Sequence, residues 1–342
     1  MKHYKKGVKA LAIKVGLNGF GRIGRSVLRA AVETGNQDIE FVAINDLGDV
    51  ETNCHLLNFD SVHGRLVPEA RVDNGQLVVG NHTIRLSAER DPANINWQGV
   101  DVVMECTGIF TSREQAALHL RDDMSRVIIS APGKNADITA VYGVNHNDIT
   151  AEHQIISNAS CTTNCLTPVA KVLNDAIGIK TGYMTTVHAY TGDQCLQDGL
   201  HKDLRRARAA GLSMVPTATG AARAVGLVLP ELLGKIDGSA IRVPTANVSV
   251  IDLKFMPNRA TSVEEINTLL SDAANGPMKG VLAVTDKPLV SIDFNHDAHS
   301  STVALDQTTV TEDGMVRIMS WYDNEWGFSN RMLDMAAHLA HK

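Results

Sequence analysis

The sequence predicts an α/β protein, in which a Rossmann-type parallel sheet is followed by a second α+β domain with a broad mixed or antiparallel sheet. The first half alternates short β-rich runs with helical stretches, as parallel strands joined by crossover helices do. The second half carries longer β-rich runs. The 342 residues are enough for two domains of roughly 150 residues, each able to bury a core.

The elements of the first half follow from β-branched runs and helical periodicity. The predicted strands are Ala12–Leu17, Phe41–Asn45, Val100–Glu105 and Val127–Ser130. The predicted helices are Ile23–Thr34 and Ser112–Leu120. The alternation ends near Ser160, and residues 1–11 form an extension ahead of the first strand.

The second half opens with a helical stretch, Cys161–Ile177. Its β-rich runs are Tyr183–Tyr190, Ile241–Phe255, Leu289–Phe294 and Val316–Tyr322. The spacing of Ser262 and Glu265 is typical of a capping box, so a helix is expected to start there. Apolar residues at helical spacing predict a terminal helix from Gly327 to His341.

Composition and charge narrow the classes of function. Hydrophobic residues make up 44% of the chain and charged residues 20%, as in globular proteins. A net charge of -6 argues against a surface for nucleic acid, which needs clustered basic residues. No apolar run reaches the roughly 20 residues of a membrane span, and the basic N-terminus lacks the features of a secretory signal. The five cysteines are an odd number without a disulfide framework, so we expect a reducing cytoplasm.

The stretch Asn18–Gly24 contains the pattern G-x-G-x-x-G between a predicted strand and a predicted helix. Gly19 permits the tight turn, Gly21 lets a pyrophosphate approach the backbone, and Gly24 allows close packing of helix on strand. The second strand ends at Asp46, where a carboxylate would bind the adenosine ribose and repel a 2′-phosphate. The alternative is a glycine-rich turn that binds nothing, but the complete context favours an NAD site.

Cys161 begins a helical stretch, where free backbone donors and the helix dipole stabilise a thiolate and lower its pKa. His188, at the end of a β-rich run, is a candidate base for it. The alternative for Cys161 is a packing role, and spacing alone does not decide between the two. The packing role is the interpretation for the other four cysteines, which are Cys54, Cys106, Cys165 and Cys195.

Three features after this pair suit an anionic substrate. Leu204–Arg208 is a basic cluster, Thr219 precedes the predicted helix Ala222–Leu229, and Arg242 opens another β-rich run. Helix N-termini and arginine side chains are common phosphate ligands. The alternative for the basic cluster is a solvated face or a salt-bridge patch between subunits. Together the three features favour a phosphorylated substrate.

Taken together, several motifs resemble the glyceraldehyde-3-phosphate dehydrogenase family from about Ile13 to the C-terminus. The strings Ser-Asn-Ala-Ser-Cys-Thr-Thr-Asn-Cys and Trp-Tyr-Asp-Asn-Glu-Trp-Gly-Phe-Ser are highly specific to that family. The other matching segments are Asn18–Gly24, His188–Gln194, Asp203–Ala210, Pro216–Ala222 and Arg242–Val250. The resemblance decides the open question at Cys161 in favour of a nucleophile.

The resemblance also implies roles for individual residues. Cys161 is the nucleophile and His188 its base. One anion site, for attacking inorganic phosphate, consists of Ser160, Thr162, Thr219 and Gly220. The site for the phosphate of the substrate consists of Thr191 and Arg242, and Arg206 serves both sites. The cofactor contacts, besides the three glycines of the motif, are Arg22, Ile23, Asp46, Arg90, Ser130 and Asn324, of which the last fixes the nicotinamide carboxamide.

The activity that this resemblance implies is the NAD-dependent, phosphorylating oxidation of glyceraldehyde 3-phosphate through a cysteine thioester, without a metal. It further implies a homotetramer, an NAD-binding domain of residues 12–160 that the helix 327–342 joins, and a catalytic domain of residues 161–326. A loop over Thr191–Ser213 would line the NAD site of a neighbouring subunit. Gly199-Leu200 departs from the Leu-Pro of many strictly NAD-specific members, which leaves exclusion of NADP open.

Two other functions deserve comparison. Erythrose-4-phosphate dehydrogenases share the Cys–His pair but depart from the pattern His-Ala-Tyr-Thr-Gly-Asp-Gln, which this chain keeps after His188. The stretch Val290–Asp297 resembles both groups and does not discriminate between them. A non-catalytic NAD- or RNA-binding protein of the same fold is disfavoured because Cys161 and His188 are both present.

Overall fold

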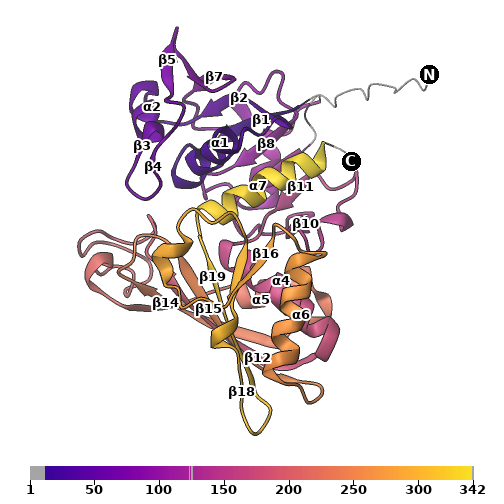
Figure 1. Cartoon of the computed structure of the whole chain (residues 1–342). Helices are drawn as coiled ribbons and strands as arrows, with labels where there is room; N and C mark the ends of the chain where they lie inside the picture. Colours follow the sequence, from indigo (N-terminus) through magenta and orange to yellow (C-terminus); the bar gives the residue numbers. More distant parts are fainter. Residues whose placement is uncertain (1–11, 123, 125, 341–342) are drawn as a thin grey trace, which may run out of the picture.

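A computed structural model describes residues 12–122, 124 and 126–340, so the predicted extension 1–11 lies outside the described residues. Two sheets dominate the structure, one built from the first half of the chain and one from the second (Figure 1). The expected fold class is therefore confirmed. No helix among the described residues is long and apolar enough to cross a membrane.

The first sheet has nine strands in the order β10-β11-β9-β8-β1-β2-β7-β6-β5. Its seven parallel strands are β1 Ile13–Asn18, β2 Ile39–Asn45, β7 His82–Ser87, β8 Val102–Glu105, β9 Arg126–Ile129, β10 Ile138–Thr139 and β11 Ile155–Ser157. The antiparallel edge consists of β5 Arg71–Asp73 and β6 Gln76–Val79. The crossovers contain α1 Arg22–Thr34, α2 Val50–Asn58 and α3 Arg113–Ala116, and a small hairpin consists of β3 Phe59–Asp60 and β4 Gly64–Arg65.

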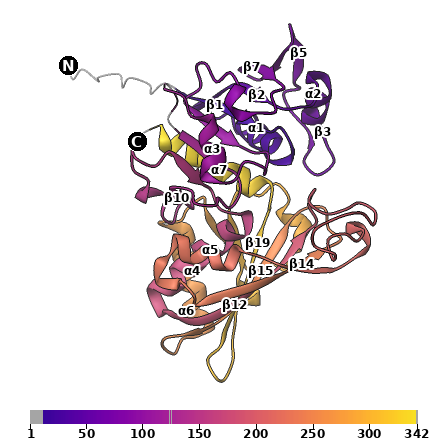
Figure 2. The same ribbon diagram turned by 180° about the vertical axis from the view of Figure 1, so that it is seen from behind.

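The second sheet has eight strands, in the order β13-β14-β12-β15-β19-β17-β16 with β18 beside β19. They are β12 Ile179–Ala189, β13 Val215–Ala218, β14 Ile236–Val243, β15 Ser249–Pro257, β16 Leu282–Thr285, β17 Ser301–Ala304, β18 Thr309–Val310 and β19 Val316–Tyr322. The sheet is mixed, because β12 pairs with β14 in parallel and with β15 antiparallel. Figure 2 shows α4 Cys161–Ile177, α5 Ala221–Val228 and α6 Val263–Asn275 gathered on one side of it.

The C-terminal helix α7, Trp326–Leu339, returns to the first half of the chain and packs beside α1 (Figure 1). Met332 and Met335 on α7 share a buried core with Leu17 of β1 and Val27 of α1. Cys161 contacts the edge of this core and also the edge of the core beneath the second sheet. The candidate nucleophile therefore lies where the two cores meet.

Three predicted elements were wrong in detail. Leu289–Phe294 is not a strand but a 3-10 turn over Ser291–Phe294, because the carboxylate of Asp293 accepts the backbone N–H of Val290 and closes the turn. Ile241–Phe255 contains two strands, since Val248 takes a positive φ of 68° and turns the chain. Ser112–Leu120 forms only a short α-helix and a 3-10 turn.

Helix starts were predicted better. α4 begins at Cys161 and ends at Ile177, as expected. Ser262 caps α6 by accepting the N–H of Glu265, but the reciprocal half of the capping box is replaced, because the Glu265 carboxylate binds Arg259 and Thr261.

Candidate active site

The glycine-rich turn between β1 and α1 has the geometry of a dinucleotide cradle. Gly19 has φ 89°, a conformation that L side chains rarely adopt, and a Cβ there would lie 2.8 Å from the backbone nitrogen of Thr107. A Cβ on Gly24 would lie 2.2 Å from the carbonyl oxygen of Gly19, so the helix packs against the turn only without a side chain. Gly21 is the N-cap of α1 and faces open space, which leaves the first N–H groups of the helix available to an anion.

Beside this turn lies a cavity of about 380 Å³ that includes Gly19, Gly21, Asp46 and Arg90 in its lining. The carboxylate of Asp46 accepts N–H groups from Phe20 at 2.8 Å and from Gly48 at 2.9 Å, which fixes its direction. A carboxylate has further lone pairs for ribose hydroxyls. The cradle and the oriented acid together fit the adenosine half of NAD.

Beneath the cavity, the buried carboxylate of Glu105 holds the neighbouring loop in place. It accepts hydrogen bonds from Asn18 Nδ2 at 2.6 Å and from the N–H of Thr107 at 2.8 Å. The His119 ring lies 3.0 Å away through Nε2, and its Nδ1 accepts from Trp97. Sequence reasoning missed this cluster, because its members come from four separate segments.

Cys161 and His188 meet although 27 residues separate them in the chain. Cys161 is the first residue of α4, whose N-cap Ser160 accepts the N–H of Thr163 at 3.0 Å. His188 stands near the end of β12, and its Nε2 lies 3.5 Å from the Cys161 sulfur. Its Nδ1 lies 2.7 Å from the carbonyl oxygen of Ala189 and 3.1 Å from Nη1 of Arg242. In the tautomer whose Nδ1 donates to the carbonyl, Nε2 carries the lone pair that faces the thiol.

Electrostatics at this pair differ from the expectation. Burial raises the pKa of the Cys161 thiol, and the opposing effects of Arg242 and of the backbone donors at the start of α4 are smaller. Burial and the Arg242 cation together lower the pKa of His188 to about 3. The expected lowering of the Cys161 pKa was therefore wrong, because desolvation raises this pKa by more than the backbone donors at the helix N-terminus lower it. Either charge alone is therefore disfavoured here.

Two further cavities open on the sulfur. One, of about 540 Å³, is lined by Cys161, His188 and four cofactor candidates, of which Arg22, Ile23 and Ser130 belong to the first half of the chain and Asn324 lies just before α7. The other, of about 370 Å³, contains Cys161, Thr162, Thr219 and Gly220. Both include Ser160, Arg206 and Arg242. The candidate nucleophile thus faces two cavities that share two arginines, which suits two anions.

The two arginines are held differently. Arg242 donates from Nη1 to the carbonyl oxygen of Ala189 at 3.0 Å and to Thr191 Oγ1 at 3.3 Å. Arg206 donates from Nε to Thr217 at 3.0 Å, and its Nη1 forms an ion pair with Asp193. Among the described residues Arg242 has no carboxylate partner, so an incoming anion meets no competitor there, whereas at Arg206 it competes with Asp193.

Thr219 lies at the N-terminus of α5, and its Oγ1 accepts the N–H of Ala221 at 3.1 Å. Thr162 lines the same cavity, but its hydroxyl is engaged with the phenol of Tyr322 at 2.8 Å. That phenol also contacts Thr186 at 2.8 Å. Sequence reasoning missed Tyr322 and Thr186, although alternation along a strand places Thr186 on the same face as His188.

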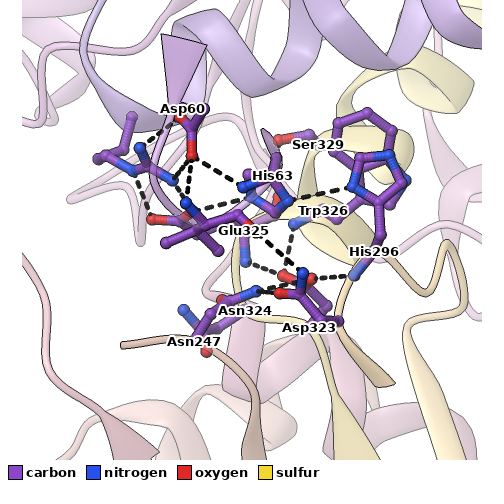
Figure 3. A network of polar contacts seen from close by, with 12 residues as sticks. Asp60, His63, Asn247, His296, Asp323, Asn324, Glu325, Trp326 and Ser329 are labelled. Atoms are coloured by element: carbon purple, nitrogen blue, oxygen red, sulfur yellow. Dashed lines mark hydrogen bonds and ion pairs between the residues drawn. The ribbon is translucent and has the colours of Figure 1, made fainter. Parts of the chain in front are cut away.

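Asn324 is held by a relay of hydrogen bonds. The N–H of Ala189 donates to Ser249 Oγ at 3.0 Å, and this hydroxyl donates to Asn324 Oδ1 at 2.8 Å. Because the amide oxygen of Asn324 accepts this hydrogen bond, its NH₂ group is the part that can donate to a ligand such as a carboxamide. Figure 3 shows Asn324 next to Glu325, whose carboxylate binds Arg22.

All the predicted site residues except Gly24, which packs beneath the turn, thus line one of three cavities, and the two cavities that contain Cys161 share several lining residues. Asp193 and Glu325 were missed, although both lie in family motifs, because nothing in sequence spacing pairs them with arginines. Within the described part of the chain, no group of three or more His, Cys, Asp or Glu residues is arranged to hold a metal ion.

Comparisons with known proteins agree with this geometry. The family model "Glyceraldehyde 3-phosphate dehydrogenase, NAD binding domain" matches residues 13–113, and the model "Glyceraldehyde 3-phosphate dehydrogenase, C-terminal domain" matches residues 160–324. A glyceraldehyde-3-phosphate dehydrogenase of Xanthobacter flavus is 63% identical over 328 residues, which is 95% of this chain and 98% of the relative. One from Cereibacter sphaeroides is 63% identical over 326 residues, with the same shares covered. Glyceraldehyde-3-phosphate dehydrogenase 1 of Bacillus subtilis is 56% identical over 335 residues, 97% of this chain and 99% of the relative.

Proposed function

Because this chain belongs to the glyceraldehyde-3-phosphate dehydrogenase family, we propose that Cys161 and His188 perform its chemistry as nucleophile and base. The chain is an oxidoreductase of glycolysis and gluconeogenesis that uses NAD and inorganic phosphate to convert glyceraldehyde 3-phosphate to 1,3-bisphosphoglycerate. The observation that carries the proposed roles is the distance of 3.5 Å between Cys161 Sγ and His188 Nε2. The two atoms lie where the cavity of about 540 Å³, which we call the cofactor cavity, meets the cavity of about 370 Å³ that contains Thr219.

The first step forms the sulfur–carbon bond. His188 Nε2 takes the thiol proton, and the Cys161 sulfur attacks the aldehyde carbon. The imidazolium and the backbone N–H groups at the start of α4 stabilise the oxyanion, which then takes the proton back as a hemithioacetal hydroxyl.

In the second step His188 Nε2 removes this hydroxyl proton as the carbon is oxidised to a thioester. Bound NAD supplies the acceptor for the hydride. The Ala189 carbonyl keeps the Nδ1–H in place, so that Nε2 acts as the base in both steps. Phosphate then attacks the thioester, an acyl phosphate forms, and the Cys161 thiolate leaves beside the imidazolium.

Two anion sites are needed because the substrate and the attacking phosphate are both charged. We assign the substrate phosphate to Arg242 and Thr191, whose side chains are already in contact. The attacking phosphate is assigned to Ser160, Thr162, Thr219 and Gly220. Arg206 borders both cavities and serves both anions.

Residues 12–160, joined by the C-terminal segment 327–342, form the NAD-binding unit of this proposal, and residues 161–326 form the catalytic unit. We further propose a homotetramer in the cytoplasm that needs no nucleic acid or membrane. Exposed apolar side chains within 191–213, such as Leu196, Leu200 and Leu212, support burial of this segment against another subunit. The five cysteines are free, which suits a reducing compartment.

The test is a Cys161→Ala variant. It should lose phosphate-dependent NAD reduction while it still binds NAD, since the sulfur is needed only for the covalent step. Parallel assays with erythrose 4-phosphate and with NADP address the rival substrate and the open cofactor preference. Retained activity of the variant would reject the thioester mechanism. The relatives' names favour the three-carbon substrate.

A further inference from the structure

Two histidines meet across the boundary between the halves of the chain, in a cluster that the proposed mechanism does not use (Figure 3). His63 lies in the turn between β3 and β4, and His296 lies in the loop after the 3-10 turn Ser291–Phe294. Their Nδ1 atoms are 3.1 Å apart. His296 belongs to the stretch Val290–Asp297, to which the sequence assigned no role.

His296 is held in an unusual conformation. Its φ of 70° is uncommon for a residue with a side chain and persists only where the surroundings fix it. Its ring stacks on Trp326 with 3.5 Å between centroids, and its backbone N–H donates to Asp323 Oδ2 at 2.7 Å. The stacking on Trp326 and the bond to Asp323 therefore hold the His296 ring in place although its backbone conformation is unfavourable.

The outer nitrogens of the two rings each face a carboxylate. His296 Nε2 lies 2.8 Å from Glu33 Oε2, and His63 Nε2 lies 3.0 Å from Glu325 Oε2. Burial raises the pKa of both acids, but their bonds to histidine and arginine outweigh it, so each pKa lies below its usual value and each acid is ionised at neutral pH. The charged groups around the pair are Arg22, Arg29 and Glu33 of α1, Asp60 of β3, Asp297 after His296, and Asp323 and Glu325 before α7.

Counting protons fixes the charge of the pair. An ionised carboxylate only accepts, so each outer nitrogen must carry a proton. The contact between the two Nδ1 atoms needs one proton more. The four nitrogens thus hold three protons, one more than two neutral imidazoles carry. A fourth proton would set two N–H groups head to head, and loss of the third would set two lone pairs head to head.

We propose that His63 and His296 share this proton and form a positioning pair, which holds the Glu325–Arg22 ion pair at the cofactor cavity within a bounded range of pH. Glu325 Oε1 accepts from Arg22 Nε at 2.8 Å, and Arg22 opens α1 directly after the glycine-rich turn. Both residues line the cavity that contains Cys161 and His188. The link to the cofactor rests on the proposed function, whereas the shared proton does not.

The shared proton predicts a stability profile that an ordinary ion pair does not give. A simple imidazolium–carboxylate pair strengthens steadily as pH falls, until the acid is protonated. This pair weakens on both sides of an intermediate pH.

We compare wild-type protein with His296→Gly, which removes the ring and suits the positive φ. Asn74→Gly serves as matched control, because Asn74 also has a positive φ, of 50°, and lies in an exposed turn.

The thermal unfolding midpoint is measured from pH 5 to pH 9 for the three proteins. The difference between wild type and His296→Gly should pass through a maximum within this range, and Asn74→Gly should show no such maximum. A difference that is flat, or that changes in one direction only, overturns the shared proton.

NAD affinity is then measured by fluorescence titration at the pH of that maximum. His296→Gly should bind NAD roughly fivefold more weakly, the lower end of typical coupling between sites, and the loss should shrink at both extremes of pH. Unchanged affinity in the variant would overturn the positioning role. Failure of wild-type protein to bind NAD would instead contradict the proposed function, while the stability profile still tests the pair.

Discussion

Replacing His188 with Asn tests whether the imidazole creates the reactive thiolate. A charged pair 3.5 Å apart gains about 5 kcal/mol at an effective dielectric constant of about 20. Desolvation of both charges opposes this gain, because burial raises the pKa of Cys161 and lowers that of His188. If half of the gain survives, loss of the imidazole lowers the thiolate population about 60-fold, since each 1.4 kcal/mol is about a factor of ten.

Alkylation of Cys161 by iodoacetamide measures this population, because the thiolate is the reacting form. Rates are followed from pH 5 to pH 9 by mass spectrometry of the peptide that contains Cys161. His188→Asn should react about 60-fold more slowly at pH 7 and recover as the pH rises. His55→Asn, on the exposed face of α2, is the matched control and should behave like wild type. An unchanged rate profile in His188→Asn would refute the pairing.

Three other substitutions probe the cofactor side. Gly24→Ala places a Cβ 2.2 Å from the Gly19 carbonyl, so it should cost about 1–3 kcal/mol in urea unfolding and also weaken NAD binding, whereas Gly21→Ala, which meets open space, should weaken NAD binding alone. Equal stability of the two variants would contradict the packing role of Gly24. At Asp60, burial raises the pKa, but bonds from Arg22 and from backbone N–H groups lower it from 3.8 to about 2. The ionised acid therefore stabilises the fold above about pH 4, by roughly 1–2 kcal/mol after screening of the partly exposed Arg22, and this is lost as pH falls toward 2. In acid unfolding, the gap between wild type and Asp60→Asn should close over that interval, and a gap that widened would exclude this interpretation.

Sequence reasoning succeeded where the deciding physics is local. The positive φ of Gly19 and the contact of Gly24 with the Gly19 carbonyl are set within the turn itself, and α4 starts at Cys161 because Ser160 caps it. Both features were predicted without tertiary information. The strand pattern gave β1 and β2 within two residues for the same reason.

It failed where the outcome depends on distant segments. The direction of the Cys161 pKa depends on burial between two cores and on Arg242, which no local pattern reports. The partners of Thr162 and of Arg206, which are Tyr322 and Asp193, were likewise missed. One failure was local: Leu289–Phe294 is apolar enough for a strand, but the carboxylate of Asp293 accepts the N–H of Val290, three residues earlier, and favours a turn.

The position of the site explains why the C-terminal helix returns to the first half of the chain. The chain crosses between the two cores at Asp323–Trp326, where Asp323 Oδ1 accepts the N–H groups of Glu325 and Trp326 at 2.9 and 2.8 Å. Asn324 and Glu325, which face the cofactor cavity, lie at this crossing. Hydride and acyl transfer require reacting atoms to be aligned within a fraction of an ångström. A segment anchored in both cores supplies that alignment. If either half of the chain shifted, Asn324 and Glu325 would move relative to Arg22 and Cys161, which line the same cavity.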